Sequence, residues 1–272
     1  MGMRIWHQSF TVLAQLPAYA DALQQHFSKV ARPDTEVVMH GMHPDTYRTN
    51  YPGTDIRHAY FQYLHGQQFV LGGVAAEEAG FDAYAIMSIP EPALRETRSV
   101  IDIPVVGYGE SSMLTATMLG DRTGVLLFIE EMAPLIQQNA ERLGLAGRFG
   151  GAKPVGFTFN DVLKGYDEPA SLIERFQSAA REMIKTGVDV IIPGEAPLCV
   201  LLARNGINRV DDVPIVDALG ATIKMAESMV DLRRSSGLAP ARRGYFTEQP
   251  PRDRVKELVK MYGMNHLMPI GK

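Results

Sequence analysis

The chain of 272 residues contains one cysteine, Cys199, and no long apolar run. A single thiol cannot form an internal disulfide, and this favours a reducing compartment. No stretch approaches the roughly 20 apolar residues that a membrane-spanning helix needs. The N-terminus also lacks a basic segment followed by an apolar one, the pattern of a secretion signal. We therefore expect a soluble, cytoplasmic protein.

The chain also lacks an excess of positive charge, because its formal net charge is −4 and no basic residues cluster. This argues against a nucleic-acid surface. Gly107-Tyr-Gly109 has neither the third glycine nor the lysine of a phosphate-binding loop. His40 and His43 have no carboxylate or cysteine placed beside them, which is a poor pattern for a metal site. We expect no metal, no cofactor, no membrane partner and a small-molecule substrate.

Two stretches of the chain, 80–88 and 187–195, repeat one pattern at a separation of 107 positions. Each begins with Gly-x-Asp, continues as an apolar run and ends on a polar residue. Downstream, 102–106 and 212–216 are both apolar runs opened by Asp-x-Pro. Short apolar runs that alternate with helical lengths are typical of parallel β-sheets covered by helices on both faces. The sequence therefore predicts an α/β fold with two related halves.

Three side chains follow the predicted strands: His7, Ser88 and Glu195. Ligands of open parallel sheets bind beyond the carboxyl ends of the strands, so these residues are candidates for a shared cleft. Each also has a structural interpretation. Glu195 could lie near a helix N-terminus, where the helix dipole stabilises a negative charge. Ser88 could cap a helix or form a hydrogen bond within a loop, and a lone histidine is usually structural. Cys199 falls within the next helix and is interpreted as a small buried residue.

Several local features depend on turn-forming residues. The polar segment 40–53 is long enough for a lid or binding loop. A helix is predicted over 60–79 with a break near Gly72-Gly73. A strand is predicted over 154–159, and a polar loop over 160–170.

The repeated stretches resemble the aspartate/glutamate/hydantoin racemase superfamily, most closely its hydantoin-racemase-like branch. The resembling segments are 80–94, 102–113, 187–195 and 213–217. The resemblance implies two pseudo-symmetric Rossmann-like lobes with an active-site cleft between them. One lobe would contain residues 1–110 and 218–272, and the other residues 111–217. It also implies cofactor-independent proton transfer beside a carboxylate or carbonyl group, and makes a homo-oligomer plausible.

The resemblance also indicates which residues should contact the substrate. The family's first-strand loop, which grips the substrate, falls here on residues 7–11. The expected substrate-binding residues are Gln8, Ser9, Thr11, Pro90, Glu110, Gly194 and Ala196.

The chain departs from the family at two positions that matter for chemistry. Family racemases place one cysteine on either face of the substrate, and Ser88 and Glu195 stand at those positions here. A buried carboxylate can exchange protons near neutral pH if a cleft raises its pKa. A serine hydroxyl needs an adjacent base before it can react. The two-thiol mechanism therefore does not transfer to this chain.

Three hypotheses follow. In the first, Glu195 is the general acid or base and Ser88 positions a small carboxylate or cyclic amide for one-base isomerisation, elimination, decarboxylation or hydrolysis. In the second, a racemase or epimerase uses His7 together with Glu195. In the third, the protein binds a small molecule without catalysis. The catalytic candidates are thus Glu195, Ser88 and His7.

Overall fold

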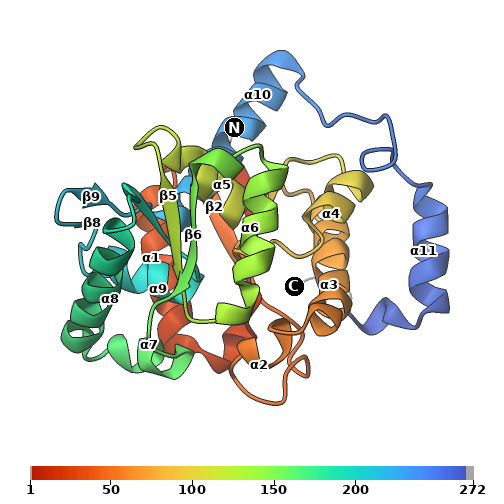
Figure 1. The fold of residues 1–272 in the computed structure, drawn as a ribbon. Coiled ribbons are helices and arrows are strands. Elements are labelled where there is room, and N and C mark those ends of the chain that lie inside the picture. The colour runs from red at the N-terminus through yellow and green to blue at the C-terminus, as the bar shows by residue number, and fades with distance from the viewer. Residues whose placement is uncertain (1, 268–272) are drawn as a thin grey trace.

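The computed structural model describes residues 2–267, and it contains two parallel β-sheets flanked by helices (Figure 1). The first sheet has the strand order β2-β1-β3-β4, and the second has the order β6-β5-β7. All pairings within these two sheets are parallel. The predicted α/β class is therefore confirmed.

The strands are β1 (Met3–Gln8), β2 (Thr35–His40), β3 (Ala83–Ile86), β4 (Val105–Gly107), β5 (Thr123–Leu127), β6 (Phe149–Pro154), β7 (Val190–Pro193) and an antiparallel pair, β8 (Arg209–Val210) and β9 (Val213–Pro214). The α-helices are α1 (Pro17–Val30), α2 (Gly53–Ile56), α3 (Ala59–Glu78), α4 (Leu94–Val100), α5 (Tyr108–Ala116), α6 (Ala133–Arg142), α7 (Phe159–Gly165), α8 (Pro169–Ile184), α9 (Ala196–Arg204), α10 (Ala218–Ser236) and α11 (Arg252–Met261). The 3-10 helices are η1 (Leu13–Gln15), η2 (Glu130–Met132), η3 (Ala146–Arg148) and η4 (Met264–Leu267).

The sequence repeat corresponds to one structural device used in both sheets. The Asp82 carboxylate, just before β3, accepts a hydrogen bond of 2.8 Å from the Arg4 amide in β1. The Asp189 carboxylate, just before β7, accepts one of 2.7 Å from the Arg122 amide next to β5. In both copies the glycine two residues earlier has a positive φ, of 73° and 87°, which an L-residue rarely adopts. The repeat thus sets the start of equivalent strands.

Both repeat strands are buried along their whole length, which explains why they read as continuous apolar runs. Helix α10 follows the second sheet in the chain but packs against β3 and β4 of the first sheet and against α1 and α5. The lobe boundaries at residues 110 and 217 remain a prediction.

The predicted helix break near Gly72-Gly73 is wrong, because α3 continues through both glycines. A Cβ at Gly72 would lie 2.8 Å from the Tyr84 hydroxyl and 3.0 Å from Gln8 Oε1. A Cβ at Gly73 would lie 2.7 Å from a methyl carbon of Thr97. These glycines allow α3 to approach the first sheet and α4 closely, and this close approach explains them without a break.

The strand predicted over 154–159 is wrong in position, because β6 ends at Pro154. Its apolar residues still enter the core: Val155 and Phe157 are buried in the irregular segment after β6. Between them Gly156 has a φ of 80°, which is incompatible with an extended strand. The alternation of apolar residues over 155–159 therefore reflects the burial of these side chains and does not indicate a strand.

The polar loop predicted over 160–170 is also wrong in its first half, which forms α7. Thr158 and Asp161 form a capping box: the Thr158 hydroxyl accepts from the Asp161 amide at 3.3 Å, and the Asp161 carboxylate accepts from the Thr158 amide at 2.8 Å. This local signal starts a helix in a polar sequence.

In the described part of the chain, no helix is both long enough and apolar enough to cross a membrane.

Candidate active site

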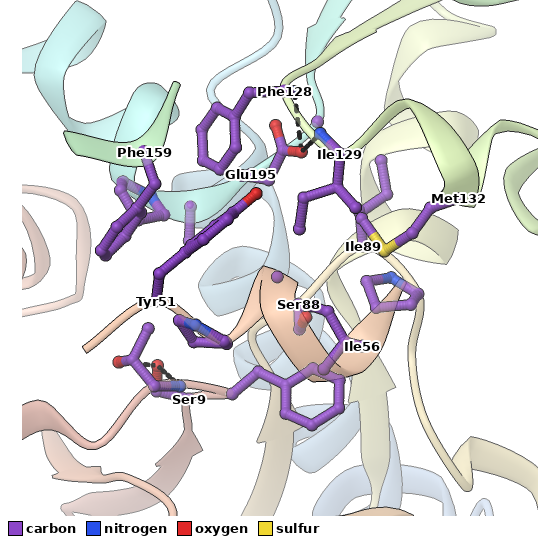
Figure 2. Close-up of a pocket in the computed structure, with 18 of the residues that line it drawn as sticks. Ser9, Tyr51, Ile56, Ser88, Ile89, Phe128, Ile129, Met132, Phe159 and Glu195 are labelled. Carbon is purple, nitrogen blue, oxygen red and sulfur yellow. Dashed lines mark hydrogen bonds between the residues drawn. The ribbon is translucent and has the colours of Figure 1, made fainter. Parts of the chain in front are cut away.

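A pocket lies where the carboxyl ends of β1, β3, β5 and β7 meet (Figure 2). It contains about 450 Å³ of space between atoms, part of it open to solvent. The lining residues are Ser9, Phe10, Thr11, Tyr19, Tyr51, Pro52, Gly53, Ile56, Met87, Ser88, Ile89, Pro90, Phe128, Ile129, Met132, Phe159, Gly194, Glu195, Ala196 and Pro197. Both sheets contribute, as expected for a cleft between related halves.

Glu195 is the N-cap residue of α9 and lies at the end of β7. Its Oε1 atom accepts hydrogen bonds from the Phe128 amide at 2.9 Å and the Ile129 amide at 3.2 Å. Its Oε2 atom is buried and has no hydrogen-bond partner among the described residues. One oxygen thus fixes the carboxyl group on the turn after β5, and the other is left for a ligand.

Burial raises the pKa of Glu195 to about 8, although the two amides act in the opposite direction. Removing a carboxylate from water disfavours its charged form more than two backbone donors favour it. At neutral pH most molecules therefore have a protonated Glu195, and a minor fraction has the ionised carboxylate. A group with a pKa near the working pH is suited to both accepting and donating a proton.

Ser88 occupies the equivalent strand end in the first sheet and also lines the pocket. Its carbonyl accepts a hydrogen bond of 3.1 Å from the Glu91 amide, which shapes the turn after β3. Each strand end is followed two residues later by a proline, Pro90 and Pro197, and both line the pocket. The structural repeat therefore brings Ser88 and Glu195 to the same space from the two sheets (Figure 2).

Five of the predicted substrate-binding residues line the pocket: Ser9, Thr11, Pro90, Gly194 and Ala196. The hydroxyl groups of Ser9 and Thr11 are 2.8 Å apart, and the Thr11 amide donates to Ser9 Oγ at 3.1 Å. This turn fixes two hydroxyl groups at the end of β1.

Gln8 and Glu110 are not brought into the pocket. The Gln8 amide group is buried behind it, donating to the Gly41 carbonyl at 3.1 Å and accepting from the Trp6 indole at 3.0 Å. Glu110, in the first turn of α5, forms an ion pair with Arg98. Both side chains have structural partners, and neither lines the pocket, so their contact with a substrate remains a prediction.

His7 is also placed away from the pocket. It is fully buried, and its ring lies 5.2 Å from that of Phe27 in α1. Burial, with a smaller contribution from His40, lowers the pKa of His7 to about 3. A neutral imidazole packed beneath α1 is not positioned to exchange a proton with a ligand beside Glu195. The structure therefore gives no support to a catalytic His7.

Sequence reasoning missed the aromatic part of the pocket. Tyr51, Phe128 and Phe159 come from three separate segments and meet around Glu195 (Figure 2). The one available signal was the polar loop 40–53, whose end carries Tyr51. Neither Phe128 nor Phe159 follows a motif, because their positions depend on how the chain folds after β5 and β6.

The pocket lining has little charge. It contains no Lys, Arg or His among the described residues, and Glu195 is its one carboxylate. Most of its surface comes from aromatic, aliphatic and proline side chains. Within residues 2–267, no group of three His, Cys, Asp or Glu side chains is placed to hold a metal ion. A neutral ligand with an apolar substituent therefore suits this pocket better than a dicarboxylate does.

Comparisons with known proteins agree with this architecture. The hydantoin racemase of Pseudomonas sp. (strain NS671) is 27% identical over 216 residues, which covers 78% of this chain and 81% of the relative. Allantoin racemase from Klebsiella pneumoniae shares the fold with a TM-score of 0.75 at 22% identity, covering 92% of this chain and 94% of that one. Glutamate racemase from Francisella tularensis matches with a TM-score of 0.57 at 15% identity, covering 86% and 82% of the two chains.

The two-lobed α/β architecture of these racemases is thus that of this chain. The family model for Asp/Glu/hydantoin racemases matches residues 17–226, which include both repeat strands and every strand of the second sheet. The chain therefore belongs to the Asp/Glu/hydantoin racemase family.

Proposed function

We propose that the protein is a cofactor-independent enzyme that moves a proton at a carbon beside the carbonyl group of a neutral cyclic amide with an apolar substituent. The observation that carries this proposal is the buried Oε2 atom of Glu195, which has no hydrogen-bond partner within residues 2–267, in a pocket whose described lining holds no cation. Family membership supports an enzyme, and the hydantoin racemase relatives support a cyclic amide as the substrate class.

The proposed step uses one carboxylate. The Oε2 atom of ionised Glu195 takes the proton from the carbon, and the C–H electron pair moves toward the adjacent carbonyl oxygen. The protonated carboxyl group then returns a proton to the carbon. With a pKa of about 8, roughly a tenth of the enzyme carries the carboxylate at pH 7. Ser88, across the pocket, serves as a hydrogen-bond donor rather than as a base.

Racemisation is a second candidate outcome of the same proton abstraction, favoured by the names of the relatives. It requires a proton donor on the opposite face of the substrate. Ser88 lies at the equivalent strand end but needs an adjacent base to exchange protons. Return of the proton by Glu195 alone would give exchange with retention of configuration.

The test is solvent-deuterium incorporation into 5-benzylhydantoin near neutral pH, followed by NMR and chiral chromatography. Wild type is compared with Glu195→Gln, and an enzyme-free sample gives the spontaneous rate. We expect exchange in the wild type and its loss in the variant. Undiminished exchange in Glu195→Gln would contradict the role of this carboxyl group. Binding of the hydantoin by the wild type without exchange would favour the non-catalytic binder.

A charged analogue tests the substrate class. Hydantoin-5-acetic acid has the same ring but adds a carboxylate, and no described residue of the pocket lining is a cation that could pair with it. We expect it to exchange much more slowly than 5-benzylhydantoin. Faster exchange of the charged compound would show that the apolar lining does not select the substrate.

A further inference from the structure

Tyr51 joins the two halves of the pocket. It lies at the end of the loop that follows β2 in the first sheet, and its ring stacks on Phe159, the first residue of α7, which follows β6 of the second sheet. The ring centroids are 5.2 Å apart and the rings are inclined by 18°. Arg57, just after α2, forms an ion pair with Glu131 in η2 and so ties the same segment to the second half. Two contacts therefore join residues 51–57 of the first half to the second half beside the pocket.

The position of the Tyr51 ring depends on the glycine two residues later. A Cβ atom at Gly53 would overlap Cζ, Oη and Cε2 of Tyr51. Gly53 opens α2 and has no positive φ, so its backbone conformation does not require glycine. The absence of a side chain at position 53 is explained by the hydroxyl end of Tyr51 lying against it. Phe159 and Gly53 thus hold the ring from two sides.

The Tyr51 hydroxyl points toward the Glu195 carboxyl group (Figure 2). Proximity is also evident in the electrostatics, because burial first and then the charge of Glu195 raise the pKa of Tyr51 to about 12. At neutral pH the hydroxyl therefore retains its proton and can donate it in a hydrogen bond. Yet it donates to no group within the described chain, whereas the buried hydroxyl groups of Tyr47 and Tyr108 each donate to a backbone carbonyl.

We propose that Tyr51 is a catalytic residue whose hydroxyl donates a hydrogen bond to the substrate carbonyl oxygen beside the carbon that faces Glu195. This inference rests on the proposed function. When Glu195 Oε2 takes the proton, the C–H electron pair becomes the new C=C bond and the carbonyl π electrons move to the oxygen. The Tyr51 hydroxyl stabilises that oxygen and keeps its own proton. Donors aimed at developing negative charge in a pocket that excludes water stabilise a transition state strongly.

The first variant is Tyr51→Phe, which retains the ring, its stacking on Phe159 and its contact with Gly53. Loss of one such donor typically slows the chemical step by roughly a hundredfold. We expect kcat for deuterium exchange of 5-benzylhydantoin to fall by about 30- to 1000-fold, with a much smaller change in KM. Tyr60→Phe, at an exposed tyrosine of α3, is the matched control and should exchange as the wild type does.

The second test uses the contact between Tyr51 and Gly53. Gly53→Ala should displace the ring and slow exchange about as much as Tyr51→Phe does. In a Tyr51→Ala background the same substitution has no ring to displace, so it should have no further effect on the rate. Such non-additivity is the sign of two residues acting through one contact.

The outcomes separate the two proposals. Wild-type exchange that is lost in Glu195→Gln but undiminished in Tyr51→Phe overturns the role of Tyr51 and leaves the proposed function intact. If Tyr51→Phe raises KM and leaves kcat unchanged, the role of Tyr51 is also overturned, because the hydroxyl would then be a binding contact that does not stabilise the transition state. Absence of exchange in the wild type overturns the proposed function, and with it this inference.

Discussion

The burial of Glu195 predicts that the stability of the fold depends on pH in a way that one substitution removes. The carboxyl group has a pKa of about 8 when folded and an ordinary value of 4.5 in water. Below pH 4.5 it is protonated in both states. Between these values the unfolded chain ionises while the folded chain holds the proton, so rising pH favours unfolding. Above pH 8 both states are ionised and the loss is complete.

The magnitude follows from the two pKa values. Each pH unit between them corresponds to about 1.4 kcal/mol. From about pH 5 to about pH 8, the wild type should lose on the order of 3 kcal/mol of unfolding free energy relative to Glu195→Gln. The glutamine carbonyl can still accept the amide hydrogen bonds of Phe128 and Ile129, so the variant changes the charge while keeping these contacts.

The assay is urea unfolding followed by circular dichroism for wild type and variant at several pH values. The difference between their unfolding free energies is what matters, because the other titrating groups cancel in it. Glu130→Gln, at an exposed carboxylate of η2, is the control, and its difference from the wild type should change little over the same range. If the difference in unfolding free energy between wild type and Glu195→Gln does not change with pH, the reasoning is refuted, because burial would then not disfavour the ionised carboxylate in the folded protein.

Three further predictions concern activity and packing. If ionised Glu195 is the base, kcat/KM for deuterium exchange should rise with pH and level off above about pH 8; a fall over this range would mean that the protonated form is required. Gly72→Ala should destabilise the fold by about 1 to 3 kcal/mol in urea unfolding, because its Cβ would meet the Tyr84 hydroxyl at 2.8 Å. Asp189→Ala removes the acceptor of the Arg122 amide and should cost about 1 to 2 kcal/mol in the same assay; an unchanged midpoint would show that water replaces it.

The sequence by itself determined the α/β class and the ends of the repeat strands. A strand buried on both faces must be apolar throughout, and a parallel connection needs a helix, so the two Gly-x-Asp runs were recognisable from local pattern alone. Their equivalence also placed Ser88 and Glu195 at the same edge of two sheets. Both residues line the pocket, since that edge is where the carboxyl ends of parallel strands meet.

Local pattern could not determine which neighbours of those strand ends face the pocket. His7 and Gln8 are the last residues of β1 and point to opposite faces of the sheet, and only Ser9, just after the strand, lines the pocket. Helix α7 is a different case: its local signal, the capping box of Thr158 and Asp161, was present in the sequence, but the polar composition of the segment was given more weight.

Only the tertiary structure decided the chemistry of the site. The pKa of Glu195 depends on how completely other segments exclude water from it, which no short stretch of sequence encodes. Tyr51 and Phe159 are more than a hundred positions apart in the chain, and their stacking exists only once both halves have folded. A strand end is fixed by neighbouring residues, whereas an enclosed pocket is fixed by contacts between distant ones.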